Sequence, residues 1–165
     1  MQITLEKLKE LRACKDGKEW FAAQKESELR KAVDALMADN RDDWARWIVS
    51  RVMTKKQRVE WAVHCAEKVL HIFEEKDPSD DRPRKAIEAA KEYLKTGNAA
   101  YAAAYAADAA ADAAYAAAYA AAYAAAYAAY AADDDAKIKT RKEFLTELLK
   151  VGCDIVERDE MEGEK

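Results

Sequence analysis

The residue types that most often perform catalysis or bind metal ions are few in this sequence and poorly spaced for either task. His64 and Cys65 are adjacent, so on a helix they point about 100° apart and cannot form a nucleophile–base pair by themselves. His71 lies about two helical turns beyond His64, too far for both imidazoles to bind one metal ion without further ligands. Cys65 shares an apolar helix face with Ala62 and Val69, which favours a small core residue over a reactive thiol. We therefore expect no enzymatic activity, no metal site and no cofactor.

The most unusual segment is residues 99–132, which contains 25 alanines, seven tyrosines and two aspartates and has no Gly, Pro or β-branched residue. Alanine has the highest helix propensity because it gives up no side-chain entropy on folding. The composition predicts one long Ala/Tyr-rich helix over this segment. The absence of Leu, Ile, Val and Phe, together with the aspartates, argues against a membrane-spanning helix.

The non-alanine residues of this segment recur at spacings of three or four, which places them in one stripe on a helix. We call this set the Tyr/Asp stripe: Tyr101, Tyr105, Asp108, Asp112, Tyr115, Tyr119, Tyr123, Tyr127 and Tyr130. Tyrosines offer rigid aromatic contacts of the kind enriched at protein interfaces. We expect the part from Tyr101 to Tyr123 to bind a protein partner, with the stripe more exposed at its N-terminal part. The same pattern also fits a repetitive expansion whose tyrosines keep an apolar helix soluble.

Composition and charge exclude several other classes of function. The chain has 165 residues, enough for one domain with a core, and a net charge of −4 that provides no basic surface for nucleic acid. The charged, amphipathic segment 1–11 is neither a signal peptide nor a transmembrane segment. Three cysteines without CxxC spacing argue against a disulfide framework or a zinc site. These features favour a reduced, cytoplasmic protein.

The apolar periodicity is helical throughout, and no alternating run typical of a strand appears. We expect an all-α fold, a single-domain bundle of about eight helices over residues 1–157, followed by an acidic frayed tail at 158–165. The helices are predicted over residues 4–14, 19–24, 27–37, 43–52, 54–75, 82–96, 99–132 and 136–158.

Local sequence signals suggest where several of these helices begin and end. Gly17 is expected to end the first helix, Ser27 to cap the third, and Asp42 or Asp43 to cap the fourth. Thr54 and Gln57 have the spacing of a capping box. Pro83 fits the first turn of a helix that ends at Gly97, and the Asp133–Asp135 run is placed to cap the last helix.

Two groups of side chains are expected to have mainly structural roles. The tryptophans are expected to lie in the core: Trp20, Trp44, Trp47 and Trp61. Arg82 and Arg84 are expected to pair with Glu67, Asp80 or Asp81 and so hold the loop between two helices. Alternatively, these arginines and Trp44 frame a recognition surface.

Three blocks of sequence carry a resemblance to a known family. They read Asp43-Trp-Ala-Arg-Trp-Ile48, Cys65-Ala-Glu-Lys-Val-Leu-His-Ile-Phe-Glu74 and Arg82-Pro-Arg-Lys-Ala-Ile-Glu-Ala-Ala90, and an Ala-rich tract with Tyr and Asp follows. This order resembles a family of small bacterial and phage proteins that are classed as immunity proteins because of their association with polymorphic toxin systems. The resemblance runs from about residue 43 to the end of the alanine tract.

The resemblance implies a non-enzymatic inhibitor that neutralises a toxin by direct binding. Because phages also encode such proteins, the partner could instead be a host defence effector. The alternative is a self-assembling structural module, a homodimer through the bare alanine faces with no outside partner. An enzyme or metal protein would require His64, Cys65, His71 and acidic residues to converge in a cleft, and no spacing supports this.

Overall fold

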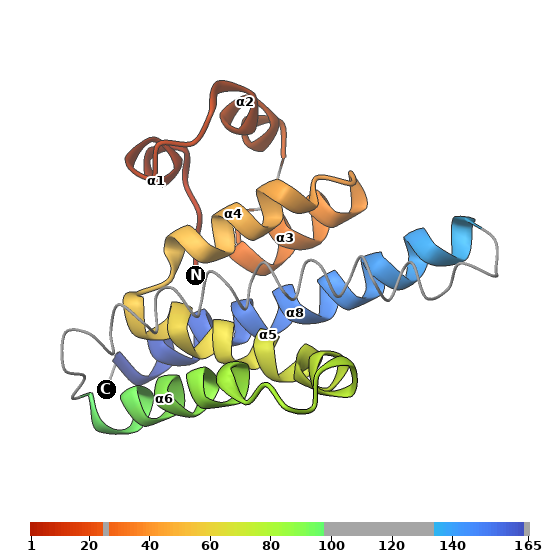
Figure 1. The fold of residues 1–165 in the computed structure, drawn as a ribbon. Coiled ribbons are helices and arrows are strands. Elements are labelled where there is room, and N and C mark those ends of the chain that lie inside the picture. Colours follow the sequence, from red (N-terminus) through yellow and green to blue (C-terminus); the bar gives the residue numbers. More distant parts are fainter. Residues whose placement is uncertain (25–26, 98–133, 164–165) are drawn as a thin grey trace. The chain divides into compact units, whose positions relative to one another are not determined.

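The computed structural model describes residues 1–24, 27–97 and 134–163, and these residues form seven helices (Figure 1). The helices are α1 (Leu5–Glu10), α2 (Lys15–Ala23), α3 (Leu29–Ala38), α4 (Asp42–Val52), α5 (Lys55–Lys76), α6 (Arg82–Thr96) and α8 (Asp134–Gly163). This part of the chain contains no strand, only an isolated antiparallel bridge between Gln2 and Glu28. The all-α prediction is confirmed. The predicted Ala/Tyr-rich helix over 99–132 lies outside the described residues.

The chain divides into two compact units. The first contains Met1–Met53 and Leu145–Lys165, and the second contains Thr54–Phe144. Helix α8 contributes residues to both. The expectation of a single domain over 1–157 stays a prediction.

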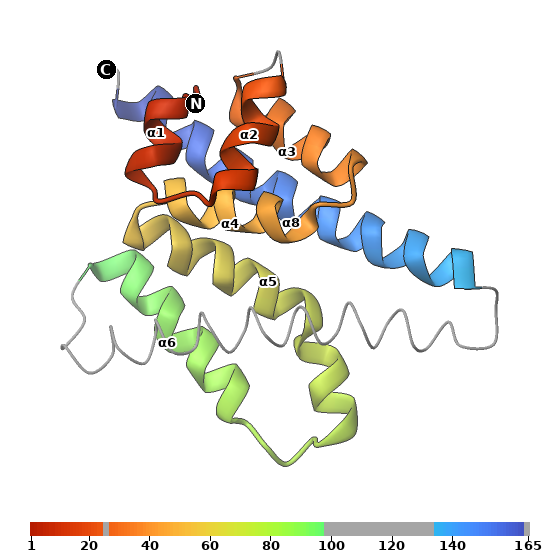
Figure 2. The same cartoon turned by 90° about the horizontal axis from the view of Figure 1, so that it is seen from above.

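The first unit is built from two pairs of neighbouring helices and the C-terminal part of α8. Helices α1 and α2 lie side by side, as do α3 and α4 (Figure 2). Apolar residues at helical spacing supply its core, because burying them removes their surface from water. The largest fully buried side chains of this unit are Ile3, Leu29, Val49, Leu149, Cys153 and Val156.

The N-terminal segment is joined to the connection that precedes α3 by backbone hydrogen bonds. The Ile3 amide donates to the Ser27 carbonyl over 2.6 Å, and the Leu29 amide donates to the Met1 carbonyl over 2.9 Å. Ile3 is 1% exposed, and Leu29 is fully buried. The paired segments therefore satisfy their backbone groups and bring two large apolar side chains into the core.

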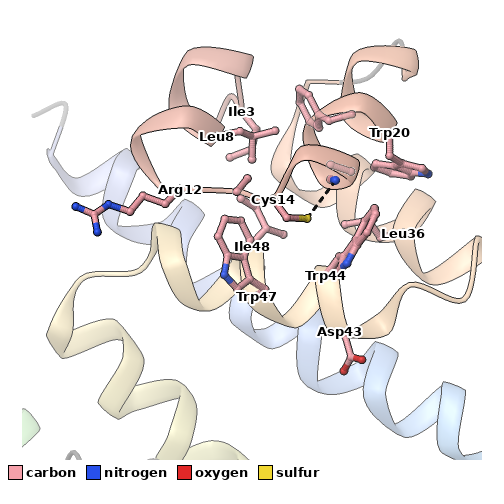
Figure 3. A pocket seen from close by; sticks show the side chains of 14 residues that line it. Ile3, Leu8, Arg12, Cys14, Trp20, Leu36, Asp43, Trp44, Trp47 and Ile48 are labelled. Carbon is pink, nitrogen blue, oxygen red and sulfur yellow. Dashed lines mark hydrogen bonds between the residues drawn. The ribbon is translucent and has the colours of Figure 1, made fainter.

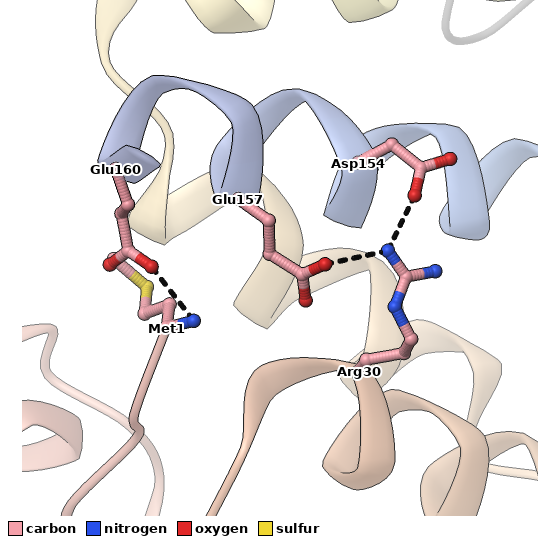
Figure 4. Close-up of polar contacts among 5 residues, drawn as sticks. All are labelled: Met1, Arg30, Asp154, Glu157 and Glu160. Carbon is pink, nitrogen blue, oxygen red and sulfur yellow. Dashed lines mark hydrogen bonds and ion pairs between the residues drawn. The ribbon is translucent and has the colours of Figure 1, made fainter. Parts of the chain in front are cut away.

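A row of acidic residues on α8 binds two cationic groups of the first unit (Figure 4). Arg30 of α3 donates to Asp154 over 2.5 Å and to Glu157 over 2.8 Å. These bonds, first the one to Glu157 and then the one to Asp154, raise the pKa of the Arg30 guanidinium. The amino group of Met1 lies 2.8 Å from Glu160. Because the three acids are spaced by three residues, they share one face of α8.

In the second unit, α5 and α6 pack against each other. Val59 and Val63 of α5 meet Ala90 of α6, and Ile87, Tyr93 and Leu94 pack around them. The predicted capping box opens α5: Thr54 Oγ1 accepts from the Gln57 amide over 3.3 Å, and Gln57 Oε1 accepts from the Thr54 amide over 2.7 Å. Helix α6 has Pro83 in its first turn and ends at Gly97 with φ of 63°, as predicted.

Three predicted helix boundaries are wrong, and neither α3 nor α4 has a side-chain hydrogen bond at its N-cap. Gly17 does not end a helix but lies inside α2, whose N-cap is Cys14. Ser27 does not cap α3, because its hydroxyl donates to Gln2 Oε1 instead, over 2.5 Å. Asp42 and Asp43 occupy the first turn of α4, where the helix dipole favours acids, and the N-cap residue is Arg41.

Two further boundaries differ from the predicted ones. Helix α1 ends at Glu10, and Arg12 then adopts a left-handed conformation with φ of 61°. Helix α8 runs from Asp134 to Gly163, and its last turns include Glu157 and Glu160, each bound to a cation of the first unit. The expected fraying of residues 158–165 stays a prediction.

Replacing Thr54 tests the capping box. We expect Thr54→Ala to lower the free energy of unfolding by about 1 kcal/mol, because the Gln57 amide loses its side-chain acceptor. Thr54→Ser keeps the hydroxyl and should retain most of the stability. Urea titration followed by circular dichroism measures both variants. Equal stability of Thr54→Ala and the unmodified protein would contradict the role of the cap.

Replacing Arg30 tests the link between α3 and α8. We expect Arg30→Gln to lower the free energy of unfolding by about 1 kcal/mol at low salt and by less at high salt, where the ion pairs are screened. Lys7→Gln is the control, because Lys7 pairs with Glu10 of its own helix at an exposed position. A loss that does not depend on salt would show that packing of the arginine stem, and not its charge, is responsible.

Candidate functional site

An open apolar cavity of about 380 Å³ lies in the first unit, lined by residues of α1 to α4 and their connections (Figure 3). Its volume falls within the range of roughly 300–1,000 Å³ that is usual for binding pockets. Four aromatic side chains dominate the lining: Trp20, Phe21, Trp44 and Trp47. Leu8, Leu36 and Ile48 contribute aliphatic surface. The lining suits an apolar group rather than a polar substrate.

The turn between α1 and α2 forms one wall of this cavity. Arg12 takes the left-handed conformation, and the Ala13 amide returns to the Leu8 carbonyl over 2.9 Å, which closes the end of α1. Helix α2 then starts at once, because the Cys14 Sγ accepts from the Gly17 amide at 3.3 Å. A Cβ on Gly17 would lie 3.3 Å from this sulfur, so a side chain there would press on the cap.

The four tryptophans do not all lie in the core, contrary to the sequence prediction. Trp61 is a core residue at 5% exposure, as expected. Trp20, Trp44 and Trp47 are instead half-buried and line the cavity. The Trp20 Nε1 donates to Asp39 Oδ2 over 2.7 Å, which fixes the ring of α2 against the end of α3. The prediction that these three rings fill the core is therefore wrong, because their positions face an open cavity.

Arginines adjoin the aromatic lining. Arg41 lies over the Trp44 ring at 4.3 Å from its centroid, and Arg51 lies 6.0 Å from the centroid of Trp47. Arg12 lines the cavity with its stem, and its guanidinium points away from the aromatic side chains in Figure 3. None of these three arginines has a carboxylate partner in residues 1–24, 27–97 and 134–163. The one acid of the lining, Asp43, pairs with Arg46.

The residues considered for catalysis do not converge. Cys65 is 1% exposed, and burial raises the pKa of its thiol to about 12, so the thiolate needed for nucleophilic attack does not form at neutral pH. His64 Nε2 is buried without a hydrogen-bond partner among the described residues, whereas His71 is exposed. Within the part of the chain that the structure describes, no group of three or more His, Cys, Asp or Glu residues is placed to hold a metal ion.

The residues predicted to bind a partner lie outside the described residues. They are Tyr101, Tyr105, Asp108, Asp112, Tyr115, Tyr119 and Tyr123. Their role in binding stays a prediction.

Arg82 and Arg84 stabilise the loop between α5 and α6. Arg82 donates to both oxygens of Asp80, over 2.8 and 2.6 Å, and this contact lowers the pKa of Asp80 to about 2. Arg84 pairs with Glu74, which was not among its expected partners, over 2.7 and 2.8 Å. Glu67 pairs instead with Lys91, over 2.5 Å. The Arg84–Glu74 and Lys91–Glu67 pairs link α6 to α5, and the Arg82–Asp80 pair holds the loop between them, in agreement with a structural role.

Residues 49–136, more than half of the chain, match the family model described as "Imm-5 like putative immunity protein". The chain belongs to this family. Residues 1–57 match a second family model, the YdhT N-terminal domain. No curated protein and no solved structure matches the chain. In the described residues, no helix combines the length and the hydropathy needed to cross a membrane.

The family comparison and the cavity concern different segments. The lining residues run from Ile3 to Ile48 and therefore precede the match to the Imm-5 like family at residues 49–136. Sequence reasoning missed the cavity, although three of the four tryptophans belong to it. Three tryptophans within a segment of short helices could have indicated the cavity. However, tryptophans at helical spacing are equally typical of a core.

Thiol labelling tests the difference in exposure among the three cysteines. Cys14 is exposed, whereas Cys65 and Cys153 are buried, and burial raises the pKa of both buried thiols to about 12. We expect a maleimide to label Cys14 alone in the folded protein at neutral pH and all three cysteines after denaturation. Mass spectrometry of tryptic peptides identifies the labelled sites. Labelling of Cys65 or Cys153 at the rate of Cys14 in the folded protein would contradict this burial.

Proposed function

We propose that this protein is a non-enzymatic inhibitor, an immunity or phage anti-defence protein that neutralises a toxin or a host effector by direct binding in the cytoplasm. The observation that carries the proposal is membership of the Imm-5 like immunity family, through residues 49–136. The buried thiol of Cys65 and the scattered histidines support a binding role over an enzymatic one. A helix bundle presents rigid surfaces, so a partner can be bound with little loss of conformational freedom.

We assign the contact with the partner to the Tyr/Asp stripe from Tyr101 to Tyr123, which lies within the segment matched by the family. Tyrosine adds large contact area and a hydroxyl to an interface at low cost in side-chain entropy. The spacing of three to four residues would give successive rings one common direction if the segment is helical.

Replacing three tyrosines tests this assignment. We expect Tyr115, Tyr119 and Tyr123 changed together to Ala to leave helicity unchanged or higher, since alanine is the better helix former. Binding to the partner should weaken by about 2 kcal/mol or more, the level of an interface hot spot. The measurement is a pull-down from the natural host with the intact and variant proteins, followed by titration of the captured protein and by light scattering.

Two controls accompany this experiment. Phe73→Ala removes an aromatic ring that is 39% exposed and lies outside the stripe, so it should leave binding unchanged. Tyr→Phe at the three positions separates the rings from their hydroxyls. A triple Ala variant that unfolds would show that the tyrosines belong to the core. A dimeric mass with no captured protein would favour the self-assembling module instead.

A further inference from the structure

The aromatic cavity of the first unit leaves apolar surface open to solvent. Trp20, Trp44 and Trp47 are half-buried, although large aromatic rings that line one cavity are usually covered in a monomer. The rings are held in place: Trp20 by its bond to Asp39, and Trp44 by the guanidinium of Arg41. A fixed, open aromatic surface of this kind is typical of a site that becomes covered on binding.

The arginines beside this cavity differ from the other arginines of the unit in their partners. Arg30 pairs with Glu157 and Asp154, Arg46 with Asp43, and Arg158 with Asp159. Among the residues that the structure describes, three arginines of the unit have no carboxylate partner, and these line the cavity or stack on its tryptophans: Arg12, Arg41 and Arg51. All three are exposed. These three guanidinium groups therefore favour carboxylates on an occupant of the cavity.

The charges lie beside the apolar lining and not within it. Arg12 directs its guanidinium away from the rings (Figure 3). The Arg41 guanidinium lies over the face of Trp44. An occupant that satisfies both features has an apolar group for the cavity and carboxylates around it. Trp and Arg together are the residues most enriched at the energetic centres of protein interfaces, which favours a protein occupant over a small molecule.

We propose that the cavity receives an apolar side chain from an acidic segment of a partner protein, whose carboxylates contact Arg12, Arg41 and Arg51. This inference rests on the proposed function, since it requires that the chain acts by binding a protein. It adds a second contact surface, in residues 3–48, to the one assigned to the Tyr/Asp stripe.

The test uses the full chain and three synthetic helical peptides of equal length. The first carries Phe flanked by glutamates, the second has lysines in place of the glutamates, and the third has Ala in place of Phe. Calorimetry measures the affinities, and the rate of maleimide labelling at Cys14, the exposed cysteine in the cavity wall, reports occupancy. We expect the first peptide to bind about tenfold or more tightly than the others and to slow labelling.

Matched variants separate charge from packing. R12Q/R41Q/R51Q changes three exposed side chains and should reduce affinity for the glutamate peptide about tenfold, with a weaker salt dependence. Arg84, Lys85 and Lys95 changed together to Gln remove the same charge from α6 in the second unit and should leave the affinity unchanged. Circular dichroism confirms that both variants fold.

Several results would overturn the proposal. Equal binding of the glutamate and lysine peptides would remove the role of the arginines, and unchanged labelling of Cys14 would place the peptide elsewhere. Protection of Cys14 by laurate but not by the peptide would indicate a small amphiphile, and protection that rises with protein concentration would indicate a second copy. If the intact protein captures a partner that the tyrosine variant does not capture, and no peptide binds the cavity, this inference is refuted and the proposed function is still supported.

Discussion

The cavity depends on the pairing of residues 1–3 with residues 27–29. Two backbone hydrogen bonds, from Ile3 to Ser27 and from Leu29 to Met1, join the two ends of the segment that contains α1 and α2. Without them, α1 and α2, both shorter than most stable isolated helices, would depend on weak local propensity alone. Burial of Ile3 and Leu29 beside these bonds makes the pairing cooperative with the core. The bond from Trp20 to Asp39 adds a link between α2 and the end of α3 in the wall of the cavity.

The division of the chain into two units agrees with the two family matches. The first unit begins with Met1–Met53, and the YdhT N-terminal domain model matches residues 1–57; the second unit begins at Thr54, close to the start of the Imm-5 like match at residue 49. The Thr54 capping box starts a long helix at this boundary. The aromatic cavity belongs to one segment and the Tyr/Asp stripe to the other, so the two proposed contact surfaces can be altered independently.

Local sequence signals predicted a helix boundary correctly where the residues that cap the helix are close together in sequence. Thr54 with Gln57, Pro83 and Gly97 each act within one turn, so their effect is independent of the rest of the fold. They failed at Gly17, Ser27 and Asp42. In the first case the Cys14 thiol supplied the cap, and in the second Ser27 bonded to Gln2, a residue distant in sequence. The Ser27 hydroxyl therefore bonds to a residue distant in sequence and does not cap the helix that follows it.

The sequence by itself determined the all-α class, most helix positions and the buried role of Cys65 and Trp61, because apolar periodicity and propensity are local properties. The family followed from the resemblance of three sequence blocks. The tertiary structure alone decided which tryptophans line a cavity and which arginines have carboxylate partners. Trp44 and Trp47 have the spacing of core residues, and only the placement of α1 and α2 beside α4 leaves their rings half-exposed. Arg30 pairs with Asp154 and Glu157, more than a hundred residues away, whereas Arg12, Arg41 and Arg51 have no carboxylate partner in the described part of the chain. Such pairings depend on distances in space, which spacing along the chain does not encode.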